Sequence, residues 1–97
     1  MNMLNQIILE GEIKNVELRA ENDLYILKVE SIMQIQGKEK VNVFECKMPD
    51  DLFNKKIEVG AKVRILGRLN CSDWVTSNDI KLSKVFISVE FIEVKEN

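Results

Sequence analysis

Histidine is absent from the 97-residue chain, and cysteine, proline and glycine are scarce, at two, one and four residues. Without an imidazole, neither a histidine-ligated metal site nor histidine acid–base catalysis is available. The two cysteines, Cys46 and Cys71, form no CxxC pair, so a zinc site is not expected. Two reduced thiols are favoured over a disulfide. With so little proline and glycine there is no linker, and we expect one domain over residues 1–97.

Long apolar runs are also missing, since none approaches the roughly 18 residues of a membrane span. The first ten residues lack the basic and apolar segments of a signal peptide. We therefore expect a cytoplasmic protein with no membrane partner.

No charge of one sign dominates, because 14 basic and 16 acidic residues give a net charge of −2. This excludes binding to nucleic acid through bulk charge but leaves room for a local basic face. The distribution is uneven: residues 38–68 hold eight basic and five acidic residues, whereas residues 10–30 hold three and six.

Motifs of catalysis are missing as well, with no P-loop, no GxSxG and no cluster of metal ligands. The pair Asp50–Asp51 is better explained as the start of a helix, and the two cysteines as small buried hydrophobes. We expect a protein that is not an enzyme and needs no cofactor or metal.

What the chain does have is alternation of apolar and polar residues, the period of β-strands. It predicts five strands, with a short helix from about Asp50 to Lys56 and a polar excursion over residues 70–82. The strands are expected near residues 5–18, 25–29, 41–46, 62–69 and 85–94. Gly11 predicts a bulge or bend in the first strand.

Five strands with a helix between the third and fourth is the order of an OB-fold, an all-β Greek-key barrel. On pattern alone, SH3-like barrels and sandwiches remain alternatives. Alternation also predicts that Val41 and Val43 face the core, which would leave Phe44 on the open face. Tyr25 has the parity of the core residues Leu27 and Val29, and core or interface positions are predicted for Phe53, Phe86 and Phe91.

Three segments resemble bacterial single-stranded DNA-binding proteins. Residues 5–13, Asn-Gln-Ile-Ile-Leu-Glu-Gly-Glu-Ile, resemble their opening strand, and residues 25–29 and 59–69 resemble their second and fourth strands. Trp74 falls where that family carries a Trp beyond the fourth strand. Residues 46–49, 59–60, 71 and 82–85 are also similar to primosomal replication protein N, a tail-less dimeric relative.

The chain departs from the family at its stacking positions. Met33 and Lys40 stand where the family often has tryptophans, Cys46 where it has Phe, and Asn70 and Ser72 where it is often basic. The Gly/Pro/Gln-rich linker and the acidic tip of the family are not expected here. These departures bear on affinity more than on fold.

Binding of single strands needs aromatic faces for bases and cations for phosphates. Trp74 is the leading stacking residue, with packing at the barrel rim or a subunit interface as its alternative, and Phe44 is the second. The remaining candidates, for which a solvated surface charge or side chain is the alternative, are Lys28, Met33, Lys38, Lys40, Lys47, Lys62, Arg64 and Arg68.

Together the residues and the resemblance predict sequence-independent binding of single-stranded DNA in replication, recombination or repair. RNA is a second candidate ligand, and replication or primosome proteins are candidate partners. The alternative function is a protein-interaction module with little nucleic-acid binding. Apolar residues on more than one face of the end strands (Ile8, Phe86, Ile92, Val94) and the resemblance predict a homodimer or homotetramer.

Overall fold

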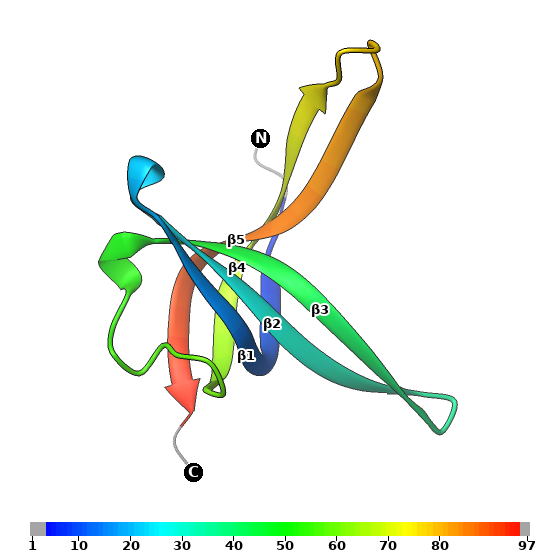
Figure 1. The fold of residues 1–97 in the computed structure, drawn as a ribbon. Coiled ribbons are helices and arrows are strands. Elements are labelled where there is room, and N and C mark those ends of the chain that lie inside the picture. The colour runs from blue at the N-terminus through cyan, green and yellow to red at the C-terminus, as the bar shows by residue number, and fades with distance from the viewer. Residues whose placement is uncertain (1–3, 96–97) are drawn as a thin grey trace.

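Five strands form a closed barrel in the computed structural model, which describes residues 4–95 (Figure 1). The order around the barrel is β1-β2-β3-β5-β4, and β4 pairs back onto β1. All pairings are antiparallel except the short parallel one between β3 and β5. This confirms the OB-fold. The strands are β1 (Ile7–Arg19), β2 (Leu24–Ile35), β3 (Lys38–Pro49), β4 (Lys62–Val75) and β5 (Lys81–Lys95).

Residues 1–3 and 96–97, the two ends of the predicted domain, lie outside the described residues. The prediction that the chain carries no acidic tail concerns this C-terminal end and is therefore not tested by the structure. Within residues 4–95, no helix is long and apolar enough to cross a membrane.

The predicted short helix is wrong in extent. Only a single 3₁₀ turn, η2 (Asp50–Leu52), forms between β3 and β4, and a second, η1 (Ala20–Asn22), joins β1 to β2. Phe53 takes an extended backbone conformation, and its ring stacks on Tyr25 with the centroids 4.3 Å apart. The helix therefore ends after one turn, and the loop that follows inserts Ile57 into the core.

Inward-facing side chains fill the barrel as the alternation predicted for three strands, β1, β2 and β4. Ile13, Leu27, Val29, Val63 and Ile65 are fully buried. Tyr25, as its parity predicted, packs against this cluster, and so do Ile92 and Val94, which were expected to need a partner surface.

The facing of β3 was predicted wrongly. Cys46 and Met48 are fully buried, so the core side of β3 is that of the even-numbered residues, while Val41 and Val43 are 53% and 56% exposed. The two valines lie on the outer side of a segment that has already left the barrel, where no core exists to select a face. The prediction that both cysteines are buried holds for Cys46 and fails for Cys71, which is exposed.

Two glycines let the strands cross closely. A Cβ atom on Gly11 would lie 2.3 Å from the Glu30 carbonyl oxygen, and one on Gly67 would lie 2.1 Å from that of Ser88. The bulge predicted near Gly11 falls between Ile13 and Asn15, and a second register shift accompanies Gly67. The tightest points of the barrel are therefore set by missing side chains.

Two long hairpins extend beyond the barrel and diverge from it (Figure 1). We call them the β2–β3 ribbon (residues 31–42) and the β4–β5 ribbon (residues 70–86). Most of the predicted polar excursion over residues 70–82 belongs to the second ribbon, since β4 continues to Val75 and β5 begins at Lys81. No residue of either ribbon is buried.

Candidate nucleic-acid interface

Cations and one aromatic ring share the outside of the barrel where the two ribbons leave it. In β5, Ile87 and Val89 face the core, so Lys84, Phe86 and Ser88 face outward. We call this surface the Lys47 face. It consists of Lys28 from β2, Glu45 and Lys47 from β3, Asn70 and Ser72 from β4, and Lys84, Phe86 and Ser88 from β5.

Glu45 holds two of these cations. Its carboxylate lies 3.0 Å from Lys84 Nζ and 3.6 Å from Lys28 Nζ. Partial burial opposes ionisation of this carboxyl, but the hydrogen bond and charge of Lys84 and the charge of Lys28 together lower its pKa. The group is thus ionised at neutral pH and joins β2 to β5 across β3.

Lys47 covers the Phe86 ring. The Lys47 ammonium lies 4.0 Å from the ring centroid, a cation–π geometry, and donates to Ser72 Oγ at 3.5 Å. Phe86 was predicted to lie in the core or an interface. It is half-buried on the outer surface, directly opposite Asn70 of β4, so the core alternative is wrong and the interface alternative stays a prediction.

Trp74 lies near the end of the β4–β5 ribbon with 46% of its surface exposed. It borders a shallow hollow of about 370 Å³ together with Lys81 and Leu82. Trp74 has the strand parity of Ser72 and Asn70, so it continues the Lys47 face outward along the ribbon. The four residues from Asn70 to Trp74 span roughly 13 Å at about 3.3 Å per residue.

The β2–β3 ribbon carries three further candidates, Met33, Lys38 and Lys40, on its other side. Lys40 pairs with Met33, and Lys38 pairs with Ile35. These side chains and Phe44 share the parity of the core residues Cys46 and Met48, so Phe44 does not face outward as predicted. It is 37% exposed because the barrel wall has ended.

Cys46, at a stacking position of the resembled family, cannot meet a base in this structure. Its side chain is fully buried. Burial, with a smaller contribution from the charge of Glu45, raises the pKa of the thiol to about 12.

Of the remaining basic candidates, Lys62 and Arg64 lie elsewhere, whereas Arg68 borders the Lys47 face, because it pairs with Ser88. Lys62 pairs with Glu12 and Lys95 at the start of β4, about 40 Å along the strand from Trp74 at 3.3 Å per residue. Arg64 lies 3.4 Å from Glu10, and Arg68 lies 3.0 Å from Glu90. The structure therefore separates Lys62 and Arg64 from Lys28 and Lys47.

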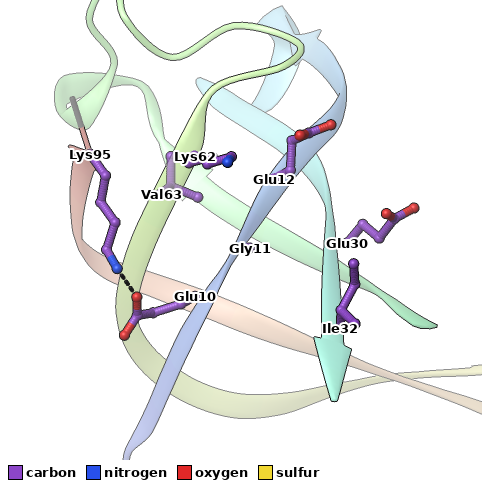
Figure 2. A pocket seen from close by; sticks show the side chains of 8 residues that line it. All are labelled: Glu10, Gly11, Glu12, Glu30, Ile32, Lys62, Val63 and Lys95. Carbon is purple, nitrogen blue, oxygen red and sulfur yellow. Dashed lines mark hydrogen bonds and ion pairs between the residues drawn. The ribbon is translucent and has the colours of Figure 1, made fainter. Parts of the chain in front are cut away.

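The surroundings of Lys62 are acidic (Figure 2). Glu10 and Glu12 from β1 and Glu30 from β2 line a hollow of about 380 Å³, and Lys62 and Lys95 line it beside them. Lys95 is hydrogen-bonded to Glu10. Three carboxylates beside two ammonium groups give no net attraction for phosphate.

Sequence reasoning missed Lys84 and misplaced Phe86. The signal was present: Ile87 and Val89 alternate with Lys84, Phe86 and Ser88, so two core residues determine where the others point. Within residues 4–95, no group of three His, Cys, Asp or Glu side chains could hold a metal ion.

Comparison with known proteins adds fold evidence. No protein-family profile and no curated protein matches the chain. Among solved structures, the Plasmodium falciparum SSB in complex with ssDNA superposes with a TM-score of 0.75 at 18% identity, covering 99% of this chain and 98% of that one. A small single-stranded DNA binding protein from Mycoplasma pneumoniae superposes with a TM-score of 0.67 at 15% identity, covering 98% of both chains. This chain has the fold of single-stranded DNA-binding proteins. The structural likeness covers nearly the whole chain, and so includes the barrel and both ribbons.

Proposed function

We propose that the protein binds single-stranded DNA without sequence preference, along a path from Trp74 over the Lys47 face and onto the β2–β3 ribbon. The observation that carries the proposal is the shared facing of Trp74, Lys84, Phe86 and Lys47 on adjacent strands. An exposed indole stacks a base, and the cations beside it meet phosphates. The two similar structures, one of them a complex with ssDNA, support this choice of ligand.

In the part of the chain that the structure describes, the β2–β3 ribbon carries cations without an ion pair, whereas Lys28 and Lys84 on the barrel pair with Glu45. Within residues 4–95, neither Lys38 nor Lys40 makes an ion pair, so both are available to phosphates. Lys62, Arg64 and Arg68 are left out of the path because acidic side chains surround or pair with them. We expect a role in replication, recombination or repair in the cytoplasm, with RNA as the competing ligand.

The test is titration of the protein with oligo-dT, followed by the fluorescence of its single tryptophan. Quenching on binding is expected. Because substitution of Trp74 removes the only tryptophan, the affinity of the variants is measured by fluorescence anisotropy of a labelled oligo-dT, and Trp74→Ala should cost roughly 1–3 kcal/mol of affinity while stability changes little. Trp74→Phe is the matched control, because it keeps an aromatic face. Wild-type protein that does not bind oligo-dT would overturn the proposal, whether or not it binds RNA.

A second candidate function, a protein-interaction module, is favoured by one observation. The outer side of the β2–β3 ribbon places Ile32 opposite Val41, with Val43 on the same side, and all three are more than half exposed. An apolar surface of this kind fits a protein partner such as a replication or primosome protein better than it fits phosphates. Retained oligo-dT binding in Val41→Ser would separate the two functions.

We also propose that the protein forms a homodimer or homotetramer through the outer side of β1, β4 and β5. Leu66 pairs with Ile8 on one side and with Phe91 on the other, so three apolar side chains stand in a row. Ile8 is 65% exposed and Phe91 is 51% exposed. Association of barrels would align several binding paths and raise affinity through effective concentration.

Light scattering over a concentration series tests the assembly. A mass of two or four times 11.2 kDa is expected, and Ile8→Glu should reduce it to one. A mass of one chain at every concentration would contradict the proposal and leave the row of apolar residues to another partner.

A further inference from the structure

Phe86 is the one aromatic ring placed among the cations of the Lys47 face, and nothing in the sequence resemblance assigned it a role. It stands on the outer side of β5, opposite Asn70 and four residues along β4 from the position of Trp74. Its neighbours on β5, Ile87 and Val89, are in the core, so the strand is held rigidly beneath it. A ring fixed on a rigid strand is the arrangement that a stacking platform requires.

The ring is not covered by the core but by a cation. The Lys47 ammonium lies 4.0 Å from the ring centroid and 3.5 Å from Ser72 Oγ. Lysine is a long, flexible side chain with a strongly hydrated head, so such a cover is worth only about 0.5–1 kcal/mol at a solvent-accessible site. A ligand that offers both a flat ring and an anion can exchange with it.

We infer that Phe86 is a second base-stacking residue and that Lys47 occupies its face until nucleic acid arrives. On binding, a base replaces the ammonium on the ring, and the ammonium moves to a phosphate of the same strand. The Phe86 ring then stacks on the base, and the Lys47 ammonium pairs with the phosphate. This inference rests on the proposed function and names residues for it.

Trp74 and Phe86 together define the line that the bound strand follows along β4 and β5. Asn70, which Phe86 faces, is four positions from Trp74, and both aromatic residues lie on the same side of β4 and β5. Lys84, opposite Ser72, lies between them. A strand that stacks one base near the ribbon end and another at the barrel passes this cation on the way.

Phe86→Leu is the main variant, because leucine retains an apolar side chain without a ring. Phe53→Leu is the matched control: it removes a phenyl ring of 37% exposure that stacks on Tyr25, whose side chain packs against the core and not on the Lys47 face. Binding is measured by fluorescence anisotropy with a labelled dT₁₅ and with a deoxyribose-phosphate oligomer of the same length that lacks bases. Circular dichroism melting checks that both variants are folded.

The expected result is a loss of about 5- to 150-fold in dT₁₅ affinity for Phe86→Leu, which is the stacking of one base by aromatic substitution. The base-free oligomer should bind this variant as it binds the wild type, and Phe53→Leu should match the wild type on both ligands. Lys47→Met should instead reduce the slope of log K against log salt by about 0.7, the effect of one phosphate.

Three outcomes decide the matter. If Phe86→Leu binds dT₁₅ as tightly as Phe53→Leu does, Phe86 is not a stacking residue. If it weakens both ligands alike and reduces the salt slope, the ring only positions Lys47, and the inference is overturned. If the wild type itself fails to bind dT₁₅, the proposed function fails, which differs from the first two outcomes because there the wild type binds.

Discussion

The barrel and the two ribbons use the same strands and the same alternation, but alternation has different consequences in each. Within the barrel, Ile65 on β4 is fully buried and its neighbour Arg64 is exposed. In the ribbons, both faces of each strand meet solvent, so Val41 and Val43 are as exposed as polar residues. Alternation fixes which side chains share a face, and only a covering layer decides which face is buried.

The largest expected effect comes from emptying the barrel. Ile65→Ala should cost about 2–5 kcal/mol of unfolding free energy, because the buried cavity cannot collapse. Val41→Ala in the β2–β3 ribbon should cost about 0.5 kcal/mol or less, since the side chain is more than half exposed. Urea unfolding of both variants measures the contrast. Equal losses would mean that the ribbon is packed against something in solution.

Replacing glycine by alanine should show the same contrast between the barrel and the ribbon. Gly67→Ala places a Cβ atom against the Ser88 carbonyl oxygen, and overpacking of this kind costs about 1–3 kcal/mol or more. Gly37, at the turn of the β2–β3 ribbon, has open space around it but a φ of +78°, so alanine there should cost only about 1–2 kcal/mol. Melting temperatures rank the two, and a harmless Gly67→Ala would contradict the tight crossing.

Glu45→Gln should sharpen the comparison where barrel and ribbons meet. It releases Lys28 and Lys84 from a shared, partly buried carboxylate, and a pair in which the lysine is exposed to solvent is worth about 0.2–1 kcal/mol. Affinity for oligo-dT should therefore rise roughly two- to tenfold, and the salt dependence should become steeper. Anisotropy titrations at several salt concentrations give both quantities.

The same variant has a pH signature. The pKa of the Glu45 carboxyl is lowered in the folded protein from its ordinary value of 4.5, so its ion pairs stabilise the native state above that pH. This contribution is lost as the pH falls through the folded-state pKa. Glu45→Gln should therefore lose less stability on acidification than the wild type does. An identical pH profile would show that the ion pairs do not form in solution.

The smallest effect concerns the two thiols. Cys46 is buried in the barrel with its pKa raised to about 12, whereas Cys71 is exposed on the β4–β5 ribbon. Under native conditions, Ellman's reagent should titrate one thiol per chain, and Cys71→Ser should abolish the fast reaction. Two thiols reacting at the same rate would mean that the barrel opens readily.

The sequence predicted much of the barrel and less of the ribbons, for physical reasons. Ile13, Leu27, Val29, Val63 and Ile65 were assigned correctly because their alternation is sustained over a strand with one covered face. The inward face of β3 was predicted wrongly for two reasons. Val41 and Val43 lie where no layer covers the strand, and the buried positions are occupied by Cys46 and Met48, which favour β-strands less than valine does. The residues beyond Asp50 form one 3₁₀ turn rather than a helix because Phe53 stacks on Tyr25, a tertiary contact.

The site was predicted by residue type better than by position. Trp74 was chosen with the help of the resemblance and Lys47 from the distribution of charge, and their strand positions put both on the outward side. Phe86 and Lys84 of β5 lie between them because β5 pairs in parallel with β3. No local pattern in the sequence predicts this pairing. Arg64 and Lys62 share the alternation of Trp74, but the strand carries them to the far end, among carboxylates.

The parallel seam between β3 and β5 also has a consequence for how the chain folds. The barrel closes there through two residue pairs, Cys46 with Ile87 and Lys47 with Ser88, whose members are 41 positions apart in the numbering. The hairpins on either side join strands adjacent in sequence and can form on the microsecond timescale. Closure must wait until a long loop has been ordered, and contacts of such separation slow folding to milliseconds or longer. We therefore expect the cation that covers Phe86 to take its place only after the hairpins have formed, when the seam closes.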